Sequence, residues 1–95
     1  MIYVIKLNIL NGIYSDIYSV DGEIFPYVCN NSNKKNPKIF KTLNCAISHL
    51  SSNSFLNSYS SEIIAWTKSE LLDYLQTVLE WSEDKIYRYA AVAFL

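Results

Sequence analysis

Residues 66–84, WTKSELLDYLQTVLEWSED, decide how the rest of the chain is interpreted, because they combine a helix start signal with a helical pattern of apolar residues. Thr67 followed by Glu70 is a capping box, in which each side chain accepts a hydrogen bond from the other residue's backbone N–H, and Trp66 can pack onto Leu71 across the start. At 100° per residue, five apolar side chains fall within about a third of the circumference. They are Leu71, Leu72, Leu75, Val78 and Leu79. The pattern predicts one amphipathic helix that begins at Thr67 and runs to the end of this stretch.

The outward side of this predicted helix is acidic. No Lys or Arg lies between Ser69 and Asp84, although oppositely charged pairs at i,i+4 stabilise a helix by roughly 0.2–0.5 kcal/mol each. Tyr74 and Trp81 lie together on one flank of the apolar stripe, either as the edge of the core or as exposed anchors. A solvated face with two aromatic residues at its rim is the simpler interpretation. The candidate partner-binding residues are Glu70, Asp73, Tyr74, Glu80, Trp81, Glu83 and Asp84.

The composition predicts one small globular domain over residues 1–95. The chain has 95 residues, of which 51% are hydrophobic and 18% charged, which suits a single core and excludes a disordered protein. A net charge of −1 argues against tight direct binding to nucleic acid, which requires a cationic surplus. Since neither a signal peptide nor an apolar run long enough for a membrane span is seen, we expect a cytoplasmic protein with no membrane contact.

Residues 2–29 have the pattern of a three-stranded antiparallel meander. Asn11-Gly12 and Asp21-Gly22 are dipeptides that favour type I′ turns, and β-prone sequence flanks each of them. Pro26 cannot donate to a ladder, so the third strand should be an edge or carry a bulge. With two-residue turns, one face should form the core. It holds Tyr3, Ile5, Leu7, Ile9, Tyr14, Tyr18, Val20, Phe25, Tyr27 and Cys29, interrupted by Asp16.

The other face of the meander is too apolar to be left in water. Something should cover it, and a second copy of the chain pairing as a homodimer through this face is one possibility. Its apolar residues are Ile2, Val4, Leu10, Ile13, Ile17, Ile24 and Val28.

The next segments are predicted to be a loop and a short helix. Residues 30–38 have turn-forming composition and should be exposed. Lys34, Lys35, Lys38 and Lys41 form a basic cluster there, which is a phosphate patch or, more simply, a set of solvated lysines. Thr42 is the expected N-cap of a helix of about ten residues. Its expected buried stripe is Leu43, Ala46, Ile47 and Leu50.

Cys45 and His49 lie four residues apart on the expected outward side of that helix. A thiol beside an imidazole is the minimum for an activated nucleophile or for two metal ligands. Zinc usually takes four ligands, and Cys29 is the one other thiol. We therefore expect an inert surface pair, and no metal or cofactor.

The rest of the chain completes an α+β fold. Residues 51–60 should be a polar loop and residues 62–66 a strand. Residues 86–95 also continue the helical stripe, but a helix from 67 to 95 would be about 43 Å long at 1.5 Å per residue, and this segment is rich in β-formers, so a strand is favoured. The predicted order is β-β-β-α-β-α-β, a two-layer sandwich with the helices on one face of one sheet.

The sequence lacks the common catalytic and nucleotide-binding motifs, and one His and one Arg leave few options for acid–base chemistry, so we do not expect an enzyme. The bias toward residues with AT-rich codons is common in low-GC bacteria and their phages. We expect a small protein that binds a larger host protein or ribonucleoprotein with a basic groove, as a phage or mobile-element inhibitor similar to anti-CRISPR proteins, acting through its acidic helix face. The alternatives are a nucleic-acid-binding module that uses the loop from Lys34 to Lys41, and a homo-oligomeric structural protein.

Overall fold

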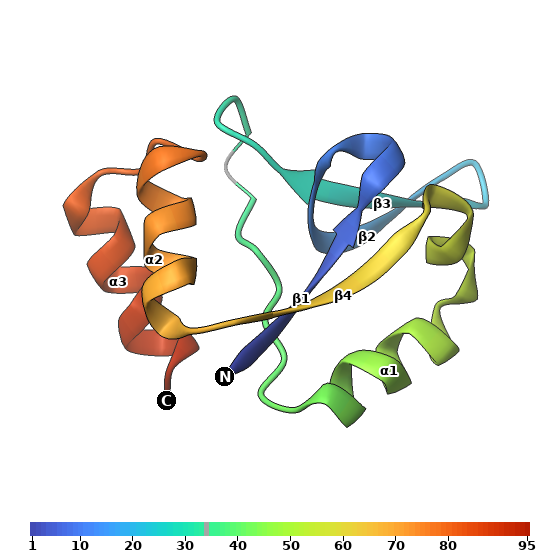
Figure 1. The fold of residues 1–95 in the computed structure, drawn as a ribbon. Coiled ribbons are helices and arrows are strands. Elements are labelled where there is room, and N and C mark those ends of the chain that lie inside the picture. The colour runs from blue at the N-terminus through green and yellow to red at the C-terminus, as the bar shows by residue number, and fades with distance from the viewer. Residues whose placement is uncertain (34) are drawn as a thin grey trace.

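The protein is an α+β domain with a four-stranded antiparallel sheet, as the computed structural model shows for residues 1–33 and 35–95 (Figure 1). The strand order is β3-β2-β1-β4. The strands are β1 (Ile2–Leu7), β2 (Gly12–Val20), β3 (Glu23–Cys29) and β4 (Ser61–Trp66). The helices are α1 (Leu43–Ser52), α2 (Lys68–Thr77) and α3 (Glu83–Ala93), with short 3-10 helices η1 (Asn8–Leu10) and η2 (Ser54–Tyr59). The α+β class is confirmed, and β3 is an edge strand as Pro26 predicts.

Helices cover both faces of the sheet, so the prediction of two layers with helices on one face is wrong. In Figure 1, α2 and α3 lie on one side of the sheet and α1 lies on the other. The strand β1 explains the third layer, because its side chains are buried on both faces in alternation. Ile2 and Val4 belong to the core beneath α2 and α3, whereas Ile5 and Leu7 belong to the core beneath α1 and η2. A central strand that is apolar on both faces requires a cover on each.

The two turns of the meander behave differently. Asp21 and Gly22 both have positive φ, at 51° and 82°, and Val20 pairs with Glu23, so the predicted two-residue turn is confirmed. The prediction of a two-residue turn at Asn11-Gly12 is wrong. β1 already ends at Leu7, which pairs with Gly12, and the 3-10 helix η1 fills the connection. Ile9 and Leu10 are therefore in an exposed turn instead of in strands.

A β-bulge in β2 divides the face that was predicted to form one core. The register shifts between Tyr14 and Asp16, so that Tyr14 pairs with Val28 while Asp16 pairs with Tyr27. One extra residue reverses which face successive side chains point to, so Tyr14 and Tyr18 lie on opposite faces of the sheet. Tyr14 joins Ile5 and Leu7 beneath α1, and on the other side lie Tyr18, Phe25, Tyr27 and Cys29.

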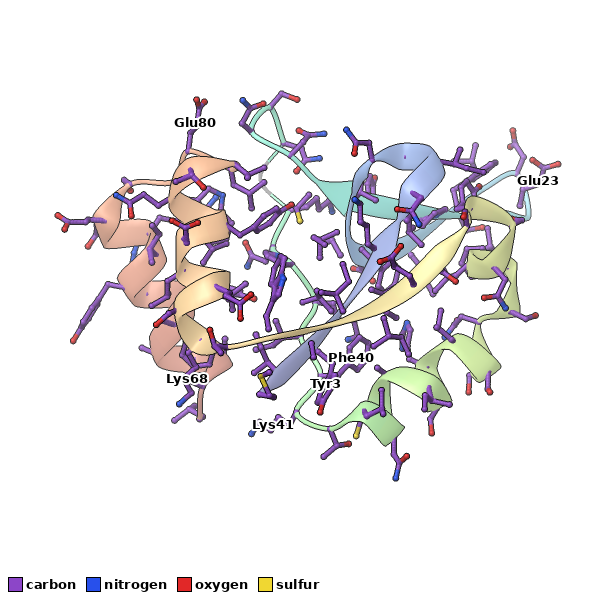
Figure 2. All side chains as sticks on the ribbon, in the orientation of Figure 1. Tyr3, Glu23, Phe40, Lys41, Lys68 and Glu80 are labelled. Atoms are coloured by element: carbon purple, nitrogen blue, oxygen red, sulfur yellow. The ribbon has the colours of Figure 1, made fainter. Side chains whose placement is uncertain are left out.

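The segment 36–40 lies between β1 and β2. The prediction of an exposed loop over residues 30–38 is therefore wrong for residues 36–38. β1 pairs with β2 only at Lys6 and Leu7 before the strands diverge. In the gap, Phe40 exchanges two backbone hydrogen bonds with Tyr3, of 2.8 and 2.9 Å, and the Lys38 N–H donates to the Tyr14 carbonyl at 3.1 Å. Figure 2 shows Tyr3 and Phe40 side by side between the helical layers. The segment thus acts as an additional short strand.

The first helix begins as predicted and buries a different stripe. The Thr42 side chain accepts from the Cys45 N–H at 3.1 Å, which confirms the N-cap. Ala46 is fully buried and Leu50 partly buried, but Leu43 and Ile47 are about half exposed, since the helix is rotated toward its His49 side. The polar stretch 51–60 is also more ordered than the predicted loop, because it contains η2 and buries Leu56.

The helix predicted over residues 67–84 starts as expected and ends early. Both hydrogen bonds of the capping box between Thr67 and Glu70 are present at 3.1 Å. The helix α2 stops at Thr77, after which Glu80 takes a left-handed φ of 56° and the Trp81 N–H donates to the Leu75 carbonyl six residues back. The left-handed residue that follows a helix is usually Gly. Because this position holds Glu80, no signal in the sequence indicates that the helix ends here.

A third helix replaces the strand predicted at the C-terminus. Ser82 caps α3 by accepting from the Lys85 N–H at 3.2 Å, and Glu83 and Asp84 lie in the first turn, where the helix dipole favours acids. The turn between α2 and α3 removes the length problem that favoured a strand, since each helix alone fits the width of the domain. Val78, which was predicted to be buried, is 54% exposed beyond the end of α2. Among the described residues, no helix is long and apolar enough to cross a membrane.

Replacing Trp81 by Ala should destabilise the fold by about 3 kcal/mol or more, because the ring is only 8% exposed and its loss leaves a cavity where α2, α3 and the sheet meet. Urea denaturation followed by far-ultraviolet circular dichroism measures the change. Tyr87→Ala is the control, since Tyr87 is 76% exposed on α3 and its loss should change stability by about 0.5 kcal/mol or less. Equal losses for both variants would contradict the position given to Trp81.

Candidate partner-binding surface

The acidic candidates lie on three consecutive pieces of the chain instead of on one helix. Glu70 and Asp73 are exposed on α2, Glu80 lies in the turn after it, and Glu83 and Asp84 are in the first turn of α3. We call these five residues the acidic surface. Figure 2 shows Glu80 at the end of the helical layer opposite to Lys68. The predicted stripe along a single helix is wrong because α2 ends at Thr77.

The acidic surface is weakly neutralised. Glu70 accepts from the Thr67 N–H in the capping box, and Glu80 accepts from the Asn31 side-chain amide at 3.2 Å. The one ion pair in the described part of the chain joins Asp84 to Arg88 at 3.1 Å, with both side chains more than 70% exposed. Because water screens an exposed ion pair, this one contributes little to stability. Four of the five carboxylates therefore have no cationic partner among the described residues.

The two aromatic candidates point into the core and are not exposed anchors. The Tyr74 hydroxyl lies 3.7 Å from the Cys29 Sγ, and burial, followed by the neighbouring Cys29, raises the pKa of Tyr74. Trp81 packs edge-on against Tyr89 with ring centroids 5.4 Å apart. Of the two interpretations open for this pair, the structure supports the core edge.

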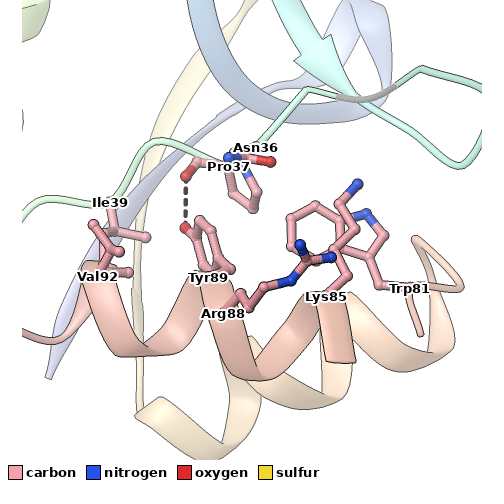
Figure 3. A pocket seen from close by; sticks show the side chains of 9 residues that line it. Asn36, Pro37, Ile39, Trp81, Lys85, Arg88, Tyr89 and Val92 are labelled. Carbon is pink, nitrogen blue, oxygen red and sulfur yellow. Dashed lines mark hydrogen bonds between the residues drawn. The ribbon is translucent and has the colours of Figure 1, made fainter. Parts of the chain in front are cut away.

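A groove beside α3 was not predicted from the sequence (Figure 3). It encloses about 520 Å³ between α3 and the extended segment 36–40. Lys85 and Arg88 stand over one end of it, and the Tyr89 hydroxyl donates to the Pro37 carbonyl at 2.7 Å across its floor. The missed signal was Ser82 followed by two acids, which marks the start of α3 and hence places these side chains on one helix.

The basic cluster of the loop does not form one patch. Lys34 lies outside the described residues. Lys35 sits over the Tyr27 ring at 4.0 Å from its centroid, Lys38 sits over the Phe40 ring at 5.7 Å, and Lys41 donates to the Leu95 carbonyl. These contacts point the three described lysines at different parts of the molecule.

His49 faces the sheet, which corrects its predicted outward position. Its Nε2 lies 2.9 Å from the Tyr14 hydroxyl, and its ring is stacked at a tilt between Tyr14 and Phe40. Burial, and then the charge of Lys38, lower the pKa of His49, while burial, and then the charge of Asp16, raise the pKa of Tyr14 to about 12. Both groups are therefore neutral near pH 7 and form a neutral hydrogen bond.

Cys45 lines a shallow hollow together with His49 and Lys38. Within residues 1–33 and 35–95, no group of three or more His, Cys, Asp or Glu side chains is placed to hold a metal ion. The two cysteines are free thiols, Cys29 buried and Cys45 exposed.

Comparison of the chain with protein families, with curated proteins and with solved structures finds no match to any of them. The functional argument therefore depends on the surfaces themselves.

Replacing His49 by Ala should cost about 1–3 kcal/mol of stability, because the buried Tyr14 hydroxyl would lose its partner. In a Tyr14→Phe background the same change should cost less, since no hydroxyl is then left unpaired. Thermal and urea denaturation of the four proteins in this cycle provide the measurement. Cys45→Ser, one turn away and exposed, should be nearly neutral. If His49→Ala is as harmless as Cys45→Ser, the hydrogen bond contributes nothing to the fold.

Proposed function

We propose that this is a small non-enzymatic protein that acts by binding a larger partner through its acidic surface. The complementary feature of the partner is a basic groove of the kind that holds nucleic acid, in a host protein or ribonucleoprotein. A phage or mobile-element inhibitor of such a complex, as anti-CRISPR proteins are, fits the proposal and the AT-rich codon bias of the sequence. In this role the carboxylates take the place of phosphates.

The observation that supports the proposal is the presence of four carboxylates without a cationic partner on one part of a nearly neutral protein. Glu70, Glu83 and Asp84 lie in the first turns of their helices, where the helix dipole favours acids, but Asp73 and Glu80 receive neither that support nor a cationic partner among the described residues. A cluster of one sign instead attracts an oppositely charged partner and raises its association rate.

The acids are also held on rigid elements. The capping box fixes the start of α2, the Trp81 to Leu75 hydrogen bond fixes its end, and Ser82 fixes the start of α3. Buried Leu79 and Trp81 bracket Glu80 and hold the turn onto the core. A partner would therefore meet charges in defined positions, at little ordering cost on this side.

The two alternative functions receive less support. The described lysines of the basic loop point at different parts of the molecule, so they do not present the continuous cationic track that nucleic acid requires. The sheet face that the sequence suggested for a homodimer is divided by the bulge: Ile2, Val4 and Ile13 lie beneath α2 and α3, whereas Ile17 and Val28 pack against the core beneath α1. We therefore propose no direct tight binding to nucleic acid and no pairing through that face.

Reversing Asp73 and Glu80 to Lys should weaken binding to the partner more than tenfold while the melting temperature holds within a few degrees. Both side chains are exposed, and the reversal removes repulsion between neighbours. Capture of the partner from a bacterial lysate by wild type, identification by mass spectrometry, and surface plasmon resonance at two salt concentrations provide the test. The loss should lie mostly in the association rate and shrink at high salt.

Glu23→Lys with Glu62→Lys is the matched control. It changes the net charge by the same amount, and each pair includes one acid that accepts from an exposed amide: Glu62 from Asn8 at 3.0 Å and Glu80 from Asn31 at 3.2 Å. Figure 2 shows Glu23 far from Glu80, at the other end of the molecule. The proposal fails if the Asp73 and Glu80 variant binds as well as wild type, or if the control loses binding equally.

A further inference from the structure

The groove beside α3 has an apolar floor and a cationic rim (Figure 3). Ile39 and Val92 face each other at one end, and the Trp81 ring closes the other. Lys85 holds its ammonium 4.0 Å from the centroid of the Trp81 ring, and Arg88 follows one helical turn later. The groove is lined by Asn36, Pro37, Ile39, Trp81, Lys85, Arg88, Tyr89, Val92 and Ala93, none of which is acidic.

One wall of the groove is fixed by its own hydrogen bonds. The Asn36 carbonyl accepts from the Ser15 hydroxyl, the Pro37 carbonyl accepts from the Tyr89 hydroxyl, and the Lys38 N–H donates to Tyr14. Pro37 is buried and has no N–H to satisfy. The bonds to Ser15 and Tyr14 tie this wall to β2, and the bond from Tyr89 fixes its distance from α3.

The other wall is equally well held. Ile86, Tyr89 and Phe94 pack against the core beneath α2 and α3, while Val92 on the groove side is 71% exposed. An apolar residue left in water beside a preformed hollow is the arrangement expected of a binding groove that is open before its ligand arrives.

The charges of the rim favour an anionic group. Asp84, which does not line the groove, pairs with Arg88, but a guanidinium has five donors and can hold a second carboxylate. Lys85 has no carboxylate within 4 Å among the described residues. A ligand carboxylate between Lys85 and Arg88, which are three residues apart on one helix face, would contact both.

The dimensions suit a short extended peptide. From Lys85 to Ala93 the helix rises by about 12 Å at 1.5 Å per residue, which is the length of about four residues of extended chain. The facing wall, residues 36–39, is itself an extended segment of the same length. A groove that is open along its side can take a segment from the middle of a chain.

We infer that this groove binds a short extended peptide segment that carries acidic residues next to large apolar ones. The carboxylate lies between Lys85 and Arg88, and an apolar side chain lies on Tyr89 between Ile39 and Val92. This site is separate in chemistry from the acidic surface, which requires a basic partner. It does not rest on the proposed function.

The test uses the full chain, labelled with ¹⁵N, and the acetylated and amidated pentapeptide of sequence DLDFD as the probe. We expect amide shifts confined to residues 36–39 and 81–93, with a dissociation constant on the order of 100 μM, as suits a few contacts in an open groove. The uncharged analogue NLNFN and the cationic analogue KLKFK should bind at least tenfold more weakly. Decanoate is titrated in parallel, because a small amphiphilic carboxylate shares the same chemistry.

Lys85→Glu with Arg88→Glu should weaken binding of DLDFD at least tenfold, and Val92→Asp should do the same without unfolding the protein, since Val92 is exposed. Lys41→Glu with Lys68→Glu is the control, because it removes two cations outside the groove: Lys41 donates to the Leu95 carbonyl and Lys68 lies over the Phe94 ring. Shifts that map elsewhere, equal binding of the three peptides, tighter binding of decanoate than of DLDFD, or unchanged binding by the Lys85 and Arg88 variant would overturn the inference.

Discussion

The extended segment 36–40 is hydrogen-bonded to both β1 and β2, and the rest of the fold depends on this insertion. β1 and β2 pair over only two residues before they separate, which would leave backbone groups of the central strand without partners. The backbone N–H and carbonyl of Tyr3 both bond to Phe40, and the Tyr14 carbonyl beside the bulge accepts from the Lys38 N–H. The side chains of the segment alternate like those of a strand, so that Ile39 reaches the core beneath α2 and α3 while Phe40 reaches the core beneath α1. A connection between elements thereby becomes part of the sheet and ties the two cores together.

The same segment positions the surfaces that carry the functional argument. It forms the fixed wall of the groove, and the Tyr89 hydroxyl holds α3 against it through Pro37. On the opposite side it places Lys38 near His49, which contributes to the neutral state of the imidazole and thus to its hydrogen bond with Tyr14. The acidic surface depends on it less directly, through the packing of Trp81 against Tyr89 at the turn between α2 and α3. The acidic surface reaches from α2 to the start of α3, and the groove runs along α3, so both depend on the tertiary contacts that hold α3 in place.

Features that depend on local chemistry were predictable from the sequence, and those that depend on distant contacts were not. The capping box at Thr67, the Thr42 cap and the Asp21-Gly22 turn each require a few neighbouring residues, and all three are confirmed. The bulge at Ser15 leaves no mark in the sequence, yet it moves Tyr14 to the opposite face of the sheet from Tyr18. The end of α2 was missed because Glu80 adopts a left-handed conformation that is usual for Gly, and a C-terminal strand was favoured because a helix without that break is too long for a small domain. The acidic residues were found by their charge alone, whereas the groove requires residues 36–39 and 81–93 to meet in space.

Hydrogen exchange of individual backbone amides, followed by NMR, tests the central claim most directly, because it reports whether residues 38–40 behave as a strand. The Lys38 and Phe40 amides should exchange as slowly as those of β1 and β4, since each donates to a neighbouring strand. The amides of the preceding turn at Asn31 and Ser32 should exchange much faster, since within residues 1–33 and 35–95 the one acceptor for either amide is the Asn30 side chain, which accepts from Ser32. If Lys38 and Phe40 exchange at the rate of that turn while β1 remains protected, the segment is a surface loop and not part of the sheet.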